Sequence, residues 1–408
     1  MQLTKSIVMM LLNIIFNFLF VSVAWAQSCP TKNLLTEPNS PFNKIPVYNQ
    51  DGSGTCYAFT ASQLANYYLI NNKKSKGPVV HPLWVALSYV KVHKGTTIRG
   101  GFVDEALDSI SDVPVCNYQS VANSLSEIAK EYGMNDHEVI GFIENFSINF
   151  RNEIKKKAAE ESKSKRDKEN FIRRYDNPMP IDNTYVHVNR PLLNERELIL
   201  RNLFYNALND TISYMKEFTS CTESNMRQLT DALAPLLKMT ESITFRALLN
   251  SDCKQTTPIK LPKTKIFKAD FDNKFKKSFR EHFANSNQPL GIHYCSTVLS
   301  NPNNDYIDGG GQSDKTRKTK KGCGQHASIL VASRPSKNSC EYLLRNTWGA
   351  GYGSWTKNWK CACKNKKTGA YFNDCKKDSH PVKQYEVVGC WIPEDKMIKN
   401  TYGAQWLE

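Results

Sequence analysis

The spacing of apolar residues changes along this 408-residue chain, and the change constrains the fold more than any other feature. From Cys56 to Ile70 apolar residues recur every three or four positions, which predicts an amphipathic helix. From about residue 288 onward, apolar runs of strand length alternate with Gly, Pro, Asn and Lys clusters, as in antiparallel sheets. The runs are 290–295, 328–332, 342–344 and 385–391. The sequence therefore predicts an α+β protein with a helical half followed by a β-rich half.

A segment of different composition separates these two halves. Residues 151–174 contain ten Lys/Arg and five Asp/Glu, whereas residues 198–215 carry apolar residues at helical spacing. We expect a large, mostly helical insertion here. The predicted organisation is a signal peptide (1–26), an N-terminal arm (27–45), the helical half (46–119), the insertion (120–285), the β-rich half (286–395) and a C-terminal tail (396–408).

The N-terminus carries an export signal. Lys5 precedes an apolar run, residues 7–26, that ends in Val-Ala-Trp-Ala before Gln27, as in a cleaved signal peptide. An uncleaved anchor is the alternative, because about 20 apolar residues can just span a bilayer. Cleavage is the favoured interpretation, so we expect a secreted or periplasmic protein without a membrane segment. Its cysteines would then be oxidised to disulfides.

The composition excludes a disordered chain but selects no partner. Hydrophobic residues make up 40% of the sequence, which is enough for one large or two medium cores. The formal net charge of +15 would allow nucleic acid, anionic membrane or acidic polymers as partners. We interpret most of this charge as a solvated surface and expect no nucleic acid.

Three positions far apart in the sequence can supply nucleophilic chemistry together. Cys56 stands at a predicted helix N-terminus, where the helix dipole stabilises a thiolate, and Gln50 lies six residues earlier. His326 opens a predicted strand and offers an imidazole. Asn346, twenty residues later, carries a side-chain amide that can accept the His326 N–H and orient the ring.

These motifs resemble those of the papain-like cysteine proteases, the papain and cathepsin family. Family members show Gln-x-x-x-x-x-Cys-Trp-Ala-Phe, then His-Ala, then Asn-Ser-Trp-Gly. This chain has, in the same order, Gln50, Cys56-Tyr57-Ala58-Phe59, His326-Ala327 and Asn346-Thr347-Trp348-Gly349. The resemblance covers residues 45–118 and 286–395, and it implies a two-domain fold with a helical left domain and an antiparallel β-rich right domain.

The resemblance also implies a role for each motif residue. Cys56 would be the nucleophile, His326 the base, Asn346 the residue that orients it, and Gln50 an oxyanion donor. Gly100 and Gly101 would line the cleft and offer backbone hydrogen bonds to an extended substrate, and Trp348 would shield the Asn–His contact from water. The implied activity is that of an endopeptidase acting on proteins or peptides, with no cofactor or metal.

The chain departs from the family pattern in three ways. Ser53 and Ile98 occupy the positions of a bridged cysteine pair, so we expect the loop to be built without that disulfide. His326 follows Cys56 by 270 residues, against about 130–150 in the family, which the insertion accounts for. Only 23 residues (27–49) lie between the predicted cleavage site and Gln50, too few for the family's inhibitory pro-segment. The insertion is a candidate for that restraining role.

Two further features have a functional and an ordinary interpretation. The eleven cysteines other than Cys56 are odd in number, so one should remain a thiol or pair between chains. Cys361, Cys363, Cys375 and Cys390 could bind zinc by composition, although disulfides are favoured in an oxidising compartment. Five of the seven residues in Lys315–Lys321 are basic, and this cluster near His326 could attract acidic substrates or a negatively charged surface.

Two rival functions stay open at this point. One is a cell-wall (peptidoglycan) peptidase or amidase of the same superfamily, which would use the same thiolate chemistry. The other is a non-catalytic binding protein on the same fold, which the intact set of Gln, Cys, His and Asn argues against. The sequence does not define the substrate specificity or the oligomeric state.

Overall fold

The computed structural model describes residues 29–50, 53–93, 98–132, 135–136, 138–141, 256–268, 272–308, 318–337, 339–353, 355 and 359–408. The predicted signal peptide and most of the predicted insertion lie outside these residues. Within the described ranges, no helix is both long enough and apolar enough to cross a membrane.

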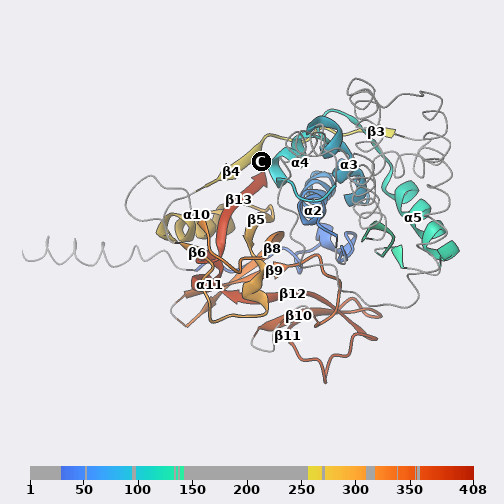
Figure 1. Cartoon of the computed structure of the whole chain (residues 1–408). Helices are drawn as coiled ribbons and strands as arrows, with labels where there is room; N and C mark the ends of the chain where they lie inside the picture. The colour runs from blue at the N-terminus through green and yellow to red at the C-terminus, as the bar shows by residue number, and fades with distance from the viewer. Residues whose placement is uncertain are drawn as a thin grey trace, which may run out of the picture.

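A nine-stranded antiparallel sheet forms the centre of the described chain (Figure 1). Its order is β11 (Tyr371–Cys375), β10 (Lys360–Asn365), β12 (Tyr385–Pro393), β9 (Ser339–Arg345), β8 (Gln325–Ser336), β5 (Leu290–Cys295), β13 (Thr401–Leu407) and β4 (Thr264–Phe267), with β1 (Lys32–Asn33) paired to β8. Two small ribbons pair β2 (Pro114–Cys116) with β3 (Thr256–Pro258) and β6 (Ile307–Asp308) with β7 (Lys318–Thr319). The four runs predicted from the two-residue period are β5, β8, β9 and β12.

Helices α2 (Cys56–Asn71), α3 (Pro82–His93) and α4 (Val103–Asp108) pack on one face of this sheet (Figure 1). The predicted helix from Cys56 is α2, and nearly all of its side chains are buried. Ile329 and Val331 of β8 point into the core that these helices share with the sheet. Helix α5 (Tyr118–Tyr132) follows β2.

Helices α10 (Asp272–Asn285) and α11 (Glu394–Ile398) contribute to a second core on the opposite face. Phe275, Phe279 and Phe283 recur every four residues along α10 and form one buried stripe. Phe279 contacts the ring of Tyr342 on β9 edge to face, with ring centroids 5.6 Å apart. This helix therefore belongs to the β-rich half, and the half begins earlier than the boundary at 286 that the sequence predicted.

The predicted C-terminal tail, residues 396–408, is also corrected by the structure. Residues Thr401–Leu407 form β13, which lies between β5 and β4 inside the sheet. Gly403 and Gln405 interrupt the apolar pattern of this segment and hide the strand. Yet Gln405 is buried, and a side chain at Gly403 would contact His293 of β5.

The N-terminal arm is held against the same sheet. Cys29 forms a disulfide with Cys340 of β9, and Leu34 and Leu35 are fully buried in the first core. The short 3-10 helix η1 (Pro41–Asn43) follows before the chain reaches Gln50.

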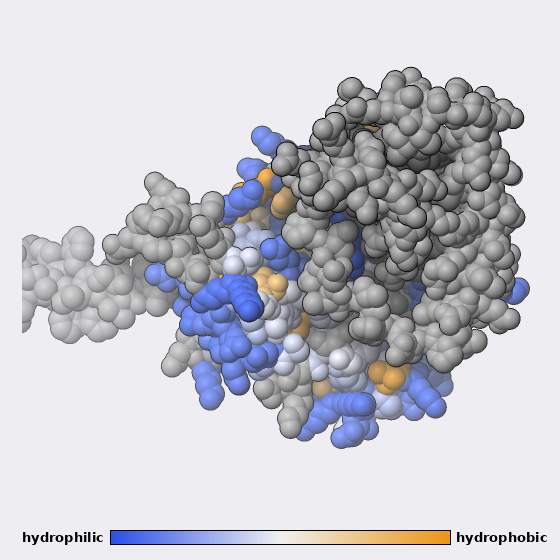
Figure 2. Space-filling model, in the orientation of Figure 1, coloured by the Kyte–Doolittle hydropathy of each residue, from blue (hydrophilic) through white to orange (hydrophobic). Residues whose placement is uncertain are grey.

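The visible surface of the described chain is mainly hydrophilic (Figure 2). Hydrophobic residues on that face form small, separate spots. The lysines of α10 contribute to a solvated surface, and Lys277 has 69% of its side chain exposed. This agrees with the interpretation of much of the basic charge as solvated.

Candidate active site

Cys56 is the first residue of α2, where backbone N–H groups point out of the helix end. Its sulfur is a thiol rather than half of a disulfide. The loop before it is closed by Ser53, whose backbone N–H and hydroxyl both donate to the Gln50 carbonyl, at 3.1 and 2.7 Å. The Ser53 hydroxyl also contacts the Thr55 hydroxyl at 2.6 Å. The sequence therefore places the nucleophile candidate at the positive end of a long helix, on a hydrogen-bonded loop.

Gln50 is buried and its side-chain amide is fixed at both ends. Nε2 donates to the Ser53 carbonyl at 2.8 Å, and the hydroxyl of Thr347 donates to Oε1. The backbone N–H of Gln50 donates to the Thr347 carbonyl at 2.7 Å. An amide nitrogen carries two hydrogens, so Nε2 has a second hydrogen besides the one that it donates to Ser53.

The structure brings His326 and Asn346 together. His326 lies on β8, and Asn346 directly follows the neighbouring strand β9. The distance from His326 Nε2 to Asn346 Oδ1 is 2.7 Å, and the backbone N–H of Thr347 donates to the same oxygen at 2.8 Å. A backbone N–H can only donate, so this atom is the amide oxygen and Nε2 of His326 carries the hydrogen. In the neutral ring Nδ1 is then the proton acceptor.

Trp348 covers the histidine. Its ring stacks on that of His326 with centroids 4.6 Å apart and an interplanar angle of 25°. The segment that carries Trp348 is itself joined to the Gln50 loop, because the Gly349 N–H donates to the Tyr48 carbonyl at 3.0 Å. The shielding role that the family resemblance implied for Trp348 stays a prediction.

Burial sets the protonation of the imidazole. It lowers the pKa of His326 to about 4, while the hydrogen bond to Asn346 raises it and nearby His293 lowers it further. An adjacent thiolate would act in the opposite direction, because it favours the imidazolium.

Cys56 lies close to two tyrosines of the β-rich half, of which Tyr294 is buried and Tyr402 is partly buried. Burial first, and then the negative charge of the Cys56 thiolate, raise the pKa of Tyr294 and of Tyr402. The ring of Tyr294 also contacts that of His326, with centroids 5.6 Å apart. Tyr294 is therefore near both members of the predicted catalytic pair.

Gly100 and Gly101 lie beside the loop that carries Cys56. The Gly100 N–H donates to the Gly54 carbonyl at 2.9 Å, and Gly100 has a φ of +72°, which favours glycine. A Cβ at Gly101 would lie 2.8 Å from the ring of Tyr57. The Tyr57 hydroxyl donates to the Ile98 carbonyl at 2.9 Å. Hydrogen bonds thus join the two segments that a disulfide would join in the family.

Arg345 was not among the predicted site residues, although it directly precedes Asn346. Its buried guanidinium donates to the carbonyls of Ile45 and Pro46 at 2.9 and 2.8 Å and to Gln63 Oε1 at 3.0 Å. It therefore joins the segment before Gln50, helix α2 and the strand that ends just before Asn346. A charged residue at the end of an apolar strand is the signal that could have identified it.

Four disulfides join described cysteines: Cys29–Cys340, Cys295–Cys323, Cys361–Cys390 and Cys363–Cys375. Cys116 is also disulfide-bonded. The predicted oxidation of the 361–390 cysteines is confirmed.

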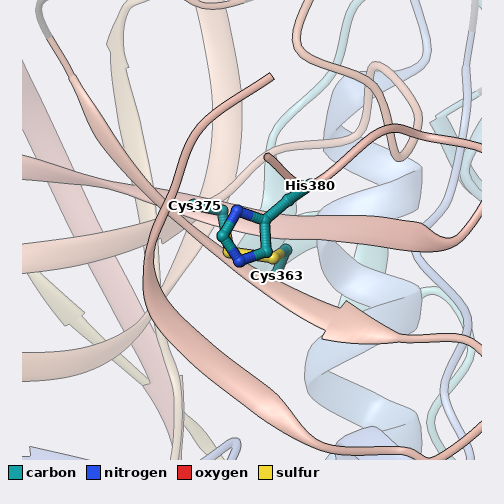
Figure 3. A group of neighbouring side chains, drawn as sticks. All are labelled: Cys363, Cys375 and His380. Carbon is teal, nitrogen blue, oxygen red and sulfur yellow. A yellow bond between two sulfur atoms is a disulfide. The ribbon is translucent and has the colours of Figure 1, made fainter. Parts of the chain in front are cut away.

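His380 lies beside the Cys363–Cys375 disulfide, and its ring nitrogen is within 4.8 Å of both sulfurs (Figure 3). Because these sulfurs are bonded to each other, they are not thiolate ligands, and the group does not fit a zinc site as it stands.

The basic cluster Lys315–Lys321 is only partly described. Residues 315–317 lie outside the described ranges, and Lys320 and Lys321 are exposed. These two lysines follow β7 and lead to Cys323. The cluster's role toward acidic substrates stays a prediction.

The chain is structurally similar to a number of solved proteins, a cysteine protease and a procathepsin among them. The first is xylellain, a cysteine protease from Xylella fastidiosa, with 14% identity, a TM-score of 0.36, and coverage of 93% of this chain and 87% of that one. The second is the digestive procathepsin L 3 of Tenebrio molitor larval midgut, with 9% identity, a TM-score of 0.34, and coverage of 94% and 77%. No family model and no curated protein matches the chain. Both TM-scores lie below 0.5.

Proposed function

We propose that this protein is an exported papain-like cysteine endopeptidase. One observation carries the proposal: a thiol at the start of α2 and a His–Asn pair on neighbouring strands are linked by the Gln50–Thr347 contact. A purely structural role does not account for this combination of side chains. Together they supply a nucleophile, a base, an orienting amide and an oxyanion donor.

The proposed reaction begins with proton transfer from the Cys56 thiol to Nδ1 of His326. The thiolate attacks the carbonyl carbon of a peptide bond, and the negative charge that develops on the oxygen is stabilised by Gln50 Nε2–H and the Cys56 backbone N–H. The imidazolium then protonates the departing amine, which leaves a thioester on Cys56. Water activated by His326 hydrolyses the thioester and restores the thiol.

The surrounding contacts assign supporting roles. Asn346 keeps the His326 ring oriented through the 2.7 Å hydrogen bond, and Trp348 excludes water from that bond. We assign Gly100 and Gly101 to the backbone that pairs with an extended substrate. Exposed Phe102 follows them and would contact substrate side chains.

Active-site labelling tests the proposal. A peptide electrophile directed at thiols should modify the wild-type protein at Cys56, located by mass spectrometry, and should fail with Cys56→Ala. His326→Ala should be labelled far more slowly. Labelling elsewhere, or undiminished labelling of Cys56→Ala, would contradict the assignment.

Substrate digestion separates the rival functions. Cleavage of casein by the wild-type protein and its loss in Cys56→Ala would support the endopeptidase. Release of fragments from purified peptidoglycan, with casein intact, would instead assign the same chemistry to cell-wall amides. Rapid labelling without turnover of either polymer would point to a binding protein.

A further inference from the structure

Asn346 receives a third hydrogen bond that the proposed mechanism does not use. Besides His326 Nε2 and the Thr347 N–H, its Oδ1 accepts from the hydroxyl of Ser328 at 3.1 Å. Ser328 is fully buried on β8, two residues after His326. It is polar in a run that is otherwise apolar, Ala327 to Ala332. This position therefore has a specific partner rather than a packing role alone.

A second hydroxyl fixes the direction of that bond. Tyr294 OH lies 3.2 Å from Ser328 Oγ, and both atoms are buried. A serine hydroxyl has one hydrogen, so it cannot donate to Tyr294 and to Asn346 at once. If the tyrosine donates to Ser328, the Ser328 hydrogen is directed at Asn346 Oδ1. Burial raises the pKa of Tyr294, which keeps the phenol protonated as a donor.

We propose that Ser328 and Tyr294 are positioning residues for His326, acting through Asn346; this proposal rests on the proposed function. The chain of hydrogen bonds runs from the Tyr294 hydroxyl to the Ser328 hydroxyl and on to Asn346 Oδ1. The same oxygen accepts the His326 N–H, so holding the amide holds the plane of the ring.

The orientation of the Asn346 side chain depends on the hydrogen bonds that its Oδ1 accepts. Within the described part of the chain, Asn346 Nδ2 is buried and has no hydrogen-bond partner. Three donors on Oδ1 therefore fix the side chain while its nitrogen contributes nothing. Without the Ser328 hydroxyl, only the adjacent backbone N–H and the histidine itself would define the amide's orientation. The ring would then rotate more freely relative to Cys56.

The arrangement of strands explains why these residues meet. β5 pairs with β8 so that Tyr294 lies opposite His326 and Ile292 lies opposite Ser328. Tyr294 therefore contacts the imidazole with its ring and reaches Ser328 with its hydroxyl. One tyrosine thus supports the histidine directly and through the asparagine.

Three variants test the proposal, with one matched control. Ser328→Ala removes the donor, Tyr294→Phe removes only the phenol oxygen, and the double variant removes both. Ser333→Ala is the control, because Ser333 is a buried serine of the same strand whose hydroxyl donates to the Pro30 carbonyl at 2.7 Å. Thermal unfolding of each variant identifies any that fail to fold.

Two measurements detect a change in the position of the His326 ring relative to Cys56. We expect Ser328→Ala to lower kcat about tenfold with KM nearly unchanged, since misplacement of a catalytic group acts on the chemical step. We also expect the pH midpoint of Cys56 alkylation by iodoacetamide to move upward, toward the ordinary thiol value of about 8.5. Ser333→Ala should change neither.

The double variant tests the order of the hydrogen bonds, from Tyr294 through Ser328 to Asn346. Because Tyr294 acts through the Ser328 hydrogen, Tyr294→Phe should add little to Ser328→Ala. Equal kcat and equal alkylation midpoints in Ser328→Ala and Ser333→Ala would overturn the proposal. Additive losses of kcat in the double variant would show that Tyr294 does not act through Ser328.

Failure of the proposed function has a different signature. In that case the wild-type protein cleaves no peptide, and Cys56 reacts no faster than an ordinary thiol. A wild-type protein that cleaves peptides and has a reactive Cys56, with Ser328→Ala unchanged, contradicts the positioning role alone.

Discussion

Replacement of Arg345 by methionine tests how the two halves of the site are held in register. The buried guanidinium contacts the arm at Ile45 and Pro46 and helix α2 at Gln63. It also lies over the ring of Phe42, 5.0 Å from the centroid. Burial lowers the pKa of Arg345, and among the described residues its hydrogen-bond acceptors are neutral oxygens. The charge is therefore held directly by oriented dipoles, while the carboxylate of Glu386 raises the pKa of Arg345 without a direct hydrogen bond.

Two opposing effects determine how much Arg345→Met lowers the free energy of unfolding. Arg345→Met leaves three acceptor oxygens without this donor, and a buried unsatisfied group costs about 1–3 kcal/mol. Removal of a buried cation gives back several kcal/mol of desolvation. The net loss is about 3 kcal/mol, which corresponds to a Tm lower by about 4 °C for a chain of this length, since the unfolding entropy is roughly 2.1 cal/mol/K per residue.

Thermal unfolding followed by near-UV circular dichroism, without reductant, measures this loss. Arg334→Met is the matched control, because Arg334 pairs with Glu341 at 2.8 Å and lies over Trp391, yet is partly exposed. We expect the control to lose at most about 1 kcal/mol. Arg345→Lys should fall between the two, because an ammonium group cannot reproduce the planar fork. An Arg345→Met protein as stable as wild type would refute the reasoning and show that desolvation outweighs the three hydrogen bonds.

Two further changes have defined outcomes. Thr347→Val removes the hydroxyl that orients the Gln50 amide, so we expect kcat/KM for a peptide substrate to fall about tenfold, with Thr347→Ser close to wild type; an unchanged rate in Thr347→Val would contradict the oxyanion role. His282 is buried with a folded pKa of about 4, below its unfolded value of about 6.5. The unfolded chain therefore binds the proton first, and stability is lost as the pH falls from 6.5 toward 4. His282→Gln should reduce the loss measured by urea unfolding between about pH 7 and 4.5 by roughly 2–3 kcal/mol, and a loss as steep as that of wild type would contradict this.

The sequence predicted elements whose apolar pattern is strong and local. Helix α2 begins at Cys56, and β5 spans Leu290–Cys295, as the spacing indicated. β10 was missed because Lys360 and Lys364 flank its cysteines, and the strand is held by pairing with β11 and β12. β13 was missed because its Gly and Gln interrupt the alternation. In both cases the neighbouring strands, rather than local propensity, determine the structure.

The same distinction between local pattern and long-range contact applies to the residues of the candidate site. Motif residues such as Cys56, His326 and Asn346 carry recognisable chemistry in a recognisable order. Ser328 and Arg345 act only because particular strands lie side by side, so spacing along the chain gives no signal for their partners. Ser328 meets Asn346 across the β8–β9 pair, and Arg345 reaches residues about 300 positions earlier in the sequence. Long-range contacts of this kind follow from topology, which the sequence pattern left open.

The two halves of the site are stabilised by different kinds of bond. The loop of Cys56 is joined to the Gly100 segment by a backbone hydrogen bond, whereas Cys295–Cys323 closes the loop just before His326. A reductant that protects the Cys56 thiol therefore also acts on the disulfide of the loop that leads to His326. Cys295 is fully buried, and thiol–disulfide exchange requires access to a sulfur. A thiolate can therefore open this bridge only by attack at the partly buried Cys323 sulfur.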